Sequence, residues 1–213
     1  MKLTPSVLDQ ARDHLKRADP VMARVLDQVG ACGLKTDTRG GPFSALAEAI
    51  LYQQLAGKAA QTIHRRFCDL VGRRFPRPED VARVSDAQLR GAGLSRQKIG
   101  YLRDLTQKAQ DGLPLARLSR LDDERVAETL TAVKGIGRWT ADMFLIFRLG
   151  RPDVLPVGDY GVQKGMQNAY RMRKLPKPDR MRRVAEPWRP YRSVACWYLW
   201  RVVDAKLPQA DGT

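Results

Sequence analysis

Two segments with helical spacing are joined by four residues, Lys134-Gly135-Ile136-Gly137, whose types suit the binding of a phosphate group. The glycines on either side of Ile136 permit positive φ and a close approach of the backbone to a ligand. The next helix begins at once, so its free N–H groups and the positive end of its dipole point out of the turn. Lys134 and Arg138 add positive charge at the two ends of the turn. Glycines between helices also form tight turns that bind nothing, so the motif alone leaves both interpretations open.

Asp159 is the second candidate for chemistry, and it lies where a helix is expected to begin near Tyr160. A fixed carboxylate can stabilise positive charge that develops on a bound substrate, and it can orient or deprotonate a water molecule. Aspartate is also a favoured helix N-cap. Because one carboxylate can cap a helix and act in catalysis, the capping interpretation does not exclude the catalytic one.

The charge of the chain favours a polyanionic partner. Its 213 residues carry 38 Lys and Arg against 23 Asp and Glu, a formal net charge of +15. Such an excess attracts nucleic acid over long range, although a basic surface without such a partner is the alternative. No segment approaches the ~20 apolar residues of a membrane-spanning helix, and residues 1–17 lack the hydrophobic core of a signal peptide. We therefore expect no membrane association and a cytoplasmic location, with the nucleoid as the site in a bacterium.

The cysteines and histidines give no metal-binding pattern. Cys32, Cys68 and Cys196 are far apart and form no CxxC pair, and His14 and His64 are the two histidines. We expect reduced thiols in a reducing compartment, no structural zinc and no iron–sulfur cluster.

Hydrophobic periodicity predicts helices along almost the whole chain. Apolar residues recur at helical spacing, and no stretch alternates like a half-buried strand. Ser85 with Gln88 predicts a capping box, and Ser95 predicts a second N-cap. The expected fold class is all-α, with about ten short helices. These are expected near residues 5–18, 21–29, 43–53, 58–71, from 85, 95–111, 121–133, 138–150, from 160, from 178 and 190–205.

Four blocks of sequence, in order, resemble the helix-hairpin-helix superfamily of DNA glycosylases. LTAVKGIGRWTADMFLIF resembles the hairpin signature, and DVLPVGDYGVQKG resembles the segment that carries the catalytic aspartate. AILYQQLAGKAAQTIHRRF is similar to the segment that reaches into DNA, and WRPYRSVACWYLWR to the last helix of the 3-methyladenine DNA glycosylase II type. Together the blocks span about Phe43 to Arg201.

The resemblance implies a two-lobed fold. We expect one lobe from residues 1–42 with 156–207, a central lobe from 43–155 that holds the hairpin, and a tail at 208–213. The N-terminal β-rich lobe of longer relatives is expected to be missing.

The resemblance also implies an activity and its catalytic residue. Asp159 falls at the catalytic aspartate of the superfamily. Trp139 occupies the position where the bifunctional members carry the lyase lysine, and neither Lys134 nor Lys164 matches that position. The expected enzyme is a monofunctional hydrolase of base excision repair that flips out alkylated purines, such as 3-methyladenine and 7-methylguanine. It cuts the N-glycosidic bond and leaves an abasic site without cutting the strand.

Further site residues follow from the same resemblance. Gln54 aligns with the residue inserted into DNA, a leucine in the usual pattern, and Met143 stands where another aromatic is expected. The predicted base pocket comprises Trp139, Trp200, Tyr52 and Met143. The predicted DNA contacts are Gln53, Gln54, Lys134, Gly135, Ile136, Gly137, Arg138 and Thr140.

No catalytic cofactor is implied, although a monovalent cation, Na⁺ or K⁺, is expected at the hairpin backbone near Val133 and Ile136. The expected partner is double-stranded DNA with alkylated bases, bound by a monomer. Two alternatives remain open: the same fold acting on oxidised or deaminated purines, and a non-catalytic helix-hairpin-helix DNA-binding module.

Overall fold

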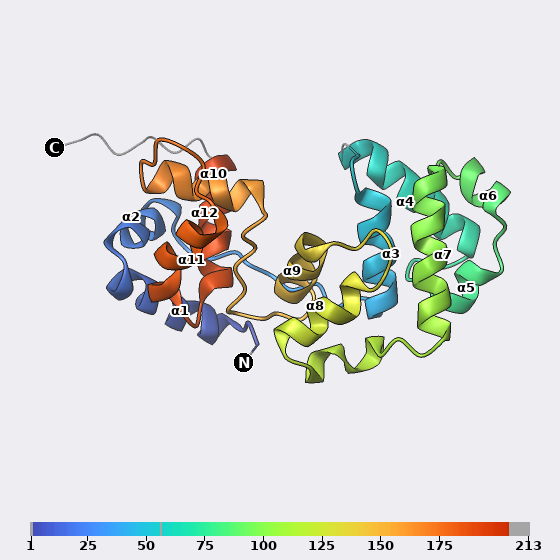
Figure 1. Cartoon of the computed structure of the whole chain (residues 1–213), viewed down its shortest axis with the longest axis horizontal. Coiled ribbons are helices and arrows are strands. Elements are labelled where there is room, and N and C mark those ends of the chain that lie inside the picture. Colours follow the sequence, from blue (N-terminus) through green and yellow to red (C-terminus); the bar gives the residue numbers. More distant parts are fainter. Residues whose placement is uncertain (1, 56, 205–213) are drawn as a thin grey trace. The chain divides into compact units, whose positions relative to one another are not determined.

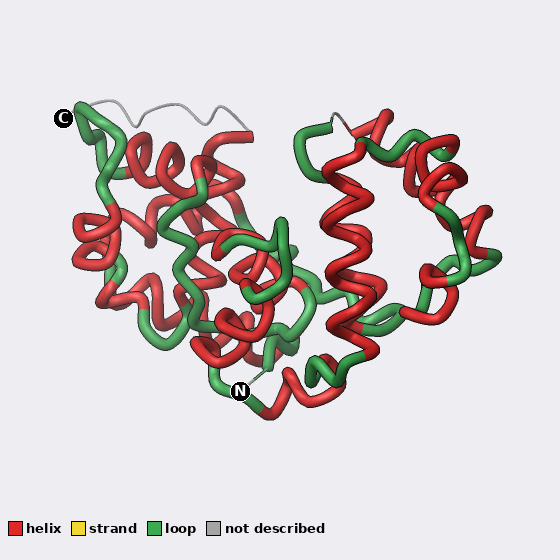
Figure 2. The backbone as a smooth tube through the Cα atoms, turned by 45° about the vertical axis from the view of Figure 1, so that its right-hand side comes forward, coloured by secondary structure: helices red, strands yellow, loops and turns green. Residues whose placement is uncertain are grey.

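The computed structural model describes residues 2–55 and 57–204, and every regular element within them is a helix. Figures 1 and 2 show these helices joined by short loops, so the expected all-α fold is confirmed. The elements are α1 (Pro5–Ala18), α2 (Pro20–Val29), α3 (Pro42–Tyr52), α4 (Gly57–Val71), α5 (Pro78–Ala82), α6 (Asp86–Gly91), α7 (Arg96–Gln110), η1 (Leu115–Arg120), α8 (Asp123–Thr131), α9 (Arg138–Phe147), α10 (Tyr160–Ala169), α11 (Pro178–Val184), η2 (Glu186–Trp188) and α12 (Arg192–Asp204).

The chain divides into two compact units. Residues 1–36 and 145–213 form the first, and residues 37–144 form the second. The boundaries differ from those expected at 42/43 and 155/156, and one of them falls inside α9. Residues after 144 belong with the chain ends because the Leu3 amide donates to the Gly150 carbonyl at 3.0 Å, and Asp153 binds Arg192 at 2.7 Å. The predicted tail at 208–213 lies outside the described residues.

The first unit is built around the contact between α10 and α12. Val162, Met166 and Leu199 are fully buried there. Gly165 lies against the backbone of α12, where a Cβ atom would come closer than 3.0 Å to the Leu199 carbonyl oxygen. The absence of a side chain at this position therefore lets the two helices approach closely.

A buried aspartate ties α2 to the C-terminal half of the first unit. Asp19 caps α2 by accepting from the Val21 amide at 2.8 Å. Its other oxygen accepts from the Trp188 indole at 2.9 Å and from the Tyr170 hydroxyl. Burial first, and then the neighbouring Asp19 carboxylate, raise the pKa of Tyr170, so this hydroxyl stays a donor at neutral pH.

In the second unit α3 packs on α4 and α7. Apolar side chains of α3, among them Leu46 and Ile50, are fully buried with Leu102 and Leu105 of α7. The predicted capping box is confirmed, since the Ser85 hydroxyl accepts from the Gln88 amide at 3.2 Å and the Gln88 side chain accepts from the Ser85 amide at 2.9 Å. Ser95 caps α7, as predicted.

Among the residues that the structure describes, no helix is both long enough and apolar enough to cross a membrane.

Gly165→Ala is expected to destabilise the protein by about 1–3 kcal/mol, because the new methyl group meets the backbone of α12 and the helices must separate. Gly100→Ala is the matched control. Gly100 is also helical, but a Cβ atom there meets nothing within 4 Å, so the change is expected to be neutral or stabilising by up to about 1 kcal/mol. Thermal unfolding of both variants is the measurement. Equal melting temperatures for the two variants would show that the α10–α12 contact tolerates a side chain.

Candidate functional site

The hairpin lies between the end of α8 at Thr131 and the start of α9 at Arg138. Gly135 has a φ of 82°, a conformation that glycine favours, and a Cβ atom there would come closer than 3.0 Å to the Tyr101 ring. Gly137 has no neighbour within 4 Å of such an atom, and its φ is not positive. Ile136 is buried and anchors the turn. The backbone geometry therefore requires the first glycine of the motif, whereas the second leaves space beside the chain.

Side chains from α7 and the end of α3 hold the hairpin in place. The Asp104 carboxylate accepts from the Lys134 amide at 2.8 Å and from Lys108 at 2.8 Å. The side-chain amide of Gln53 donates from Nε2 to the Gly135 carbonyl at 2.8 Å. Gln53, which the sequence placed among the DNA contacts, therefore supports the hairpin in this structure.

The charge state of Asp104 follows from these contacts. Burial by itself raises the pKa of Asp104, but the hydrogen bonds from Lys108 and from the Lys134 amide outweigh it and hold the pKa below its ordinary value. The carboxylate is therefore ionised at neutral pH, and its negative charge lies next to the Lys134 amide that donates to it.

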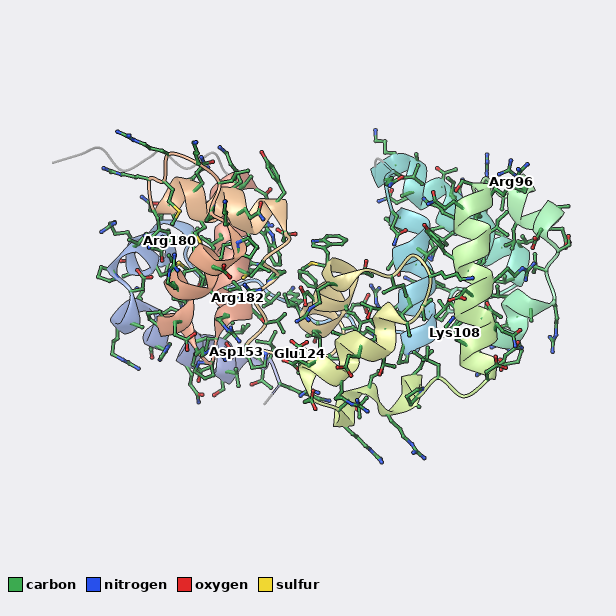
Figure 3. The ribbon with its side chains drawn as sticks, in the orientation of Figure 1. Arg96, Lys108, Glu124, Asp153, Arg180 and Arg182 are labelled. Atoms are coloured by element: carbon green, nitrogen blue, oxygen red, sulfur yellow. The ribbon has the colours of Figure 1, made fainter. Side chains whose placement is uncertain are left out.

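Arg138 is bound to two carboxylates at the start of α9. Its guanidinium donates to both oxygens of Glu124, each at 2.8 Å, and to Asp142 at 2.9 Å. Figure 3 labels Glu124 on α8. The Arg138 hydrogen bond lowers the pKa of Glu124, whereas burial raises that of Asp142 against the opposing effect of Arg138. Because Arg138 is already neutralised, it joins α9 to α8, and its predicted phosphate contact stays a prediction.

The turn after α3 projects polar and apolar side chains into solvent. Gln54 has a φ of 56°, an uncommon conformation for a residue with a side chain. Leu55 beside it is 37% exposed. The Lys98 ammonium donates to the Leu51 carbonyl at 2.6 Å and fixes the end of the helix. Sequence reasoning selected Gln54 and missed Leu55, although an apolar residue at the tip of a turn was a visible signal.

The predicted pocket residues of the second unit differ in exposure. Trp139 is 50% exposed directly after the hairpin, and Met143 one turn further along α9 is half-buried. Tyr52 is half-buried, with its ring edge-on to His64 at 5.8 Å between centroids. Thr140, predicted as a DNA contact, is buried, because it lies on the side of α9 that faces the protein interior. Trp139 therefore offers the largest exposed aromatic surface of this group.

Asp159 is the N-cap of α10 and is 7% exposed. Its Oδ1 atom accepts from the Val162 amide at 2.7 Å and from the Trp200 indole N–H at 2.8 Å. A Cβ atom at Gly161 would lie 2.8 Å from the Trp200 ring and 3.1 Å from Oδ1 of Asp159. The small residue at 161 therefore lets the indole reach the carboxylate.

The loop before Asp159 is fixed by hydrogen bonds to its backbone. The Asp159 amide donates to the Pro156 carbonyl at 2.9 Å, and the Gln163 side chain donates to the Val157 carbonyl at 2.9 Å. The Ser193 hydroxyl of α12 accepts from the Val154 amide at 2.9 Å. Both the loop and the helix thus hold the carboxylate in one position.

Two aromatic residues near Asp159 were missed by the sequence reasoning. Phe147 stacks on Trp200 with 5.6 Å between centroids and an angle of 26°. Tyr160, the residue after Asp159, is 65% exposed. An exposed aromatic next to a catalytic candidate was visible in the sequence, whereas the stacking of Phe147 depends on tertiary packing.

The described residues contain no group of three or more His, Cys, Asp or Glu side chains that could hold a metal ion. At the hairpin, the Val133 carbonyl accepts from the Ile136 amide at 3.1 Å.

The family of this chain follows from a comparison with known proteins. Residues 47–190 match the model of the HhH-GPD superfamily base excision DNA repair proteins. The chain therefore belongs to this superfamily.

Individual relatives agree with this assignment. The chain is 34% identical over 198 residues to DNA-3-methyladenine glycosylase 1 of Schizosaccharomyces pombe, covering 91% of this chain and 87% of the relative. A crystal structure of a DNA-3-methyladenine glycosidase from Bacillus halodurans matches with a TM-score of 0.83 and 37% identity, covering 93% and 92% of the two chains. A Schizosaccharomyces pombe 3-methyladenine DNA glycosylase in complex with abasic DNA matches with a TM-score of 0.80 and 33% identity, covering 95% and 100%.

Asp104→Ala is expected to destabilise the protein by about 1–3 kcal/mol, because the Lys134 amide and Lys108 lose their shared acceptor. The lowered pKa of Asp104 means that its contribution is present above the ordinary carboxylate pKa of about 3.9 and is lost as pH falls through the lowered value. The cost of the substitution should therefore be large at pH 7 and shrink in acid. Urea denaturation at several pH values is the measurement.

Asp111→Ala is the matched control for this experiment, because Asp111 is exposed and its carboxylate accepts from Gln107. Its loss is expected to cost less than about 0.5 kcal/mol. An Asp104→Ala cost that did not change with pH would contradict the ionised role given to this carboxylate.

Proposed function

We propose that this protein is a monofunctional DNA glycosylase that removes alkylated purines from double-stranded DNA by hydrolysis of the N-glycosidic bond. The observation that carries the proposal is the fixed carboxylate of Asp159, held by the Val162 amide and the Trp200 indole at the start of α10. The relatives are named for 3-methyladenine, which supports a cationic alkylpurine as substrate.

Asp159 acts on the sugar rather than on the base. Departure of a purine builds positive charge on the deoxyribose ring, and a fixed carboxylate beside C1′ stabilises that charge. The same group orients or deprotonates the attacking water. Because the two donors that hold Oδ1 are in place before substrate binds, little reorganisation is needed at the moment of reaction.

Trp139 and Trp200 take different parts in this scheme. The exposed indole of Trp139 offers a face on which an electron-poor alkylated base can stack. Trp200 donates its N–H to Asp159 and stacks on Phe147, so it orients the carboxylate in addition to lining the base pocket. Tyr52 and Met143 are proposed base-contacting residues of the second unit, together with Trp139.

The hairpin and the turn after α3 bind the DNA backbone and the gap left by the flipped nucleotide. Free amides at the start of α9 and the charge of Lys134 suit a phosphate oxygen. A monovalent cation at the Val133 carbonyl fits this chemistry, since a carbonyl oxygen carries a second lone pair beside the one that Ile136 engages. Leu55 is exposed and apolar, so it joins Gln54 as a candidate for insertion between bases.

The direct test of the function is incubation with methylated DNA followed by hot alkali, which cleaves the strand at each abasic site. Strand breaks that need both enzyme and alkali support the proposal. Release of oxidised or deaminated purines with no release of alkylpurines would favour the other lesion classes. No release of any base by the folded protein would favour a DNA-binding module without catalysis.

Asp159→Asn is expected to lose most base excision, by at least about a hundredfold, because the amide cannot stabilise positive charge on the sugar. Binding to abasic-site DNA should persist, and the amide oxygen still caps α10. Single-turnover excision and DNA affinity are the paired measurements. Full activity in a folded variant would refute the catalytic assignment.

Product strands are expected to stay intact until alkali or an endonuclease is added, because Trp139 occupies the position of the lyase lysine. Borohydride reduction is the measurement, since it traps a Schiff base as a stable adduct. A covalent adduct between the protein and the DNA above background would overturn the monofunctional assignment.

Trp200→Phe is expected to slow excision by about ten- to a hundredfold, since the carboxylate loses a hydrogen bond to a charged group worth about 1.5–3 kcal/mol. Trp197→Phe is the matched control on the same helix, and it should leave the rate within about twofold because Trp197 contacts Arg201 and Tyr198. Excision kinetics and melting temperature are measured together. If both variants slow the reaction equally, or if the rate falls only as far as the fold is lost, Trp200 is a core residue and not a positioning residue.

A further inference from the structure

A run of basic residues lies at the end of α10 and along α11. From Arg171 to Arg183 the chain holds seven Lys and Arg and one Asp, a net charge of +6 out of +15 for the whole chain. We call residues 171–183 the basic segment. Its charged members are Arg171, Arg173, Lys174, Lys177, Asp179, Arg180, Arg182 and Arg183.

The positive charges of the basic segment are exposed and largely without carboxylate partners. All seven basic side chains are exposed, and Figure 3 labels Arg180 and Arg182 on α11. Arg182 pairs with Asp179 at 2.8 Å, whereas the other six form no ion pair with an acidic side chain among the described residues. By contrast, Arg138 is held by Glu124 and Asp142, and Arg192 is held by Asp153.

The backbone of the basic segment is ordered by packing. Pro176 is buried and Met181 is fully buried. The Met172 amide donates to the Gln167 carbonyl at 2.9 Å, and Pro178 occupies the first turn of α11. Six like charges are thus displayed from a fixed scaffold, although their mutual repulsion destabilises it. A structure that keeps such charges close together and unneutralised is suited to a polyanion.

The position of the segment separates it from the catalytic carboxylate. Asp159 caps the start of α10, and Arg171 follows its end. The ten residues of α10 span about 15 Å at 1.5 Å per residue. Since successive phosphates of one strand are about 3.4 Å apart along the duplex axis, this length corresponds to about four to five base pairs. Arg171, where the segment begins, therefore lies about four base pairs' length from the residue that caps the other end of α10.

We propose that the basic segment is a second surface for the backbone of duplex DNA, separate from the lesion site. It rests on the proposed function only in taking DNA as the substrate. Its Lys and Arg side chains bind phosphates without reading sequence, and the counterions that they release provide the affinity. The phosphates belong either to the flank of the damaged duplex or to a second duplex nearby, and both sources present the same chemistry.

The test compares two variants with the same change of charge. The first is Arg173→Gln/Lys174→Gln/Lys177→Gln in the basic segment. The control is Arg83→Gln/Arg117→Gln/Arg120→Gln, three exposed residues of the other unit. None of the six has been placed in the catalytic or hairpin machinery, so both proteins should fold and retain Asp159 chemistry.

Affinity for undamaged duplex of about 25 base pairs is measured across a range of salt concentrations. We expect the basic-segment variant to bind about tenfold more weakly at low salt, with a slope of log K against log salt reduced by up to about 3, at about 0.9 per lost phosphate contact. The control should stay within about twofold of the unchanged protein. Equal effects of the two variants, or no effect of either, would overturn the proposal.

Excision on short and extended duplexes separates the two sources of phosphate. A duplex with about four base pairs on each side of the lesion should be processed equally by the variant and the unchanged protein. If extension of one flank restores a difference between them, the segment binds the damaged duplex. If a difference between the two proteins appears only when undamaged duplex is added, the basic segment binds this second duplex in a ternary complex. A loss of activity on the shortest duplex would place the segment in the main site and overturn the proposal.

Failure of the proposed function gives a different result. An unchanged protein that excises no base would refute the glycosylase, while the comparison of affinities for undamaged DNA still decides the role of the basic segment. The unchanged protein could instead bind vesicles of anionic lipid and not DNA. If the triple variant abolished that binding, the surface would be assigned to a membrane and the proposal of a DNA surface would be refuted.

Discussion

The close approach of α10 to α12 is the constraint on which the position of the Asp159 carboxylate depends. Gly161 and Gly165 stand four residues apart and therefore on one face of α10, and each lies where a side chain would collide with α12. The backbone at Leu199 packs directly against Gly165, and the ring of Trp200 packs directly against Gly161. The indole N–H can reach Asp159 at 2.8 Å because both glycines lack a Cβ atom. The same two glycines thus allow both the close packing of α10 on α12 and the orientation of the Asp159 carboxylate.

The hairpin depends on a different kind of support. A turn with exposed amides gains little stability from its own contacts, so the groups that fix it must come from neighbouring helices. Asp104 supplies a charged acceptor from α7, Gln53 supplies a donor from the end of α3, and the Tyr101 ring fills the space beside Gly135. Because Gln53 directly precedes Gln54, the turn that carries the insertion candidates and the hairpin share one hydrogen bond. The hairpin is therefore tied to the residue that precedes Gln54.

The sequence predicted features that depend on neighbouring residues, such as helices and caps. It did not predict contacts between residues far apart in the chain. The capping box at Ser85 and the helical character of nearly every segment follow from residues within one or two turns of each other. The N-cap position of Asp159 followed from the same kind of signal. The support given by Gln53 and the pairing of Arg138 with Glu124 join residues 82 and 14 positions apart, so no local pattern encodes them.

Aligned motifs place a residue in the site but do not say which of its atoms act. Trp200 was expected in the base pocket, yet its N–H and its face both have partners within its own unit, in Asp159 and Phe147.

The arginines of this protein divide according to whether carboxylates surround them, and this division explains how one chain can attract DNA and still hold a precise site. A guanidinium bound by carboxylates, as Arg138 is by Glu124 and Asp142 and Arg192 is by Asp153, contributes little field at long range but fixes the elements that it joins. An unpaired one, as in the basic segment, contributes its full charge to the surrounding potential and almost nothing to the fold. If every arginine near the hairpin were unpaired, the turn would be attracted to any phosphate but would lack a defined shape. Separating the two roles along the chain lets electrostatic attraction be strong where geometry is not critical, and lets geometry be rigid at the elements that Arg138 and Arg192 join.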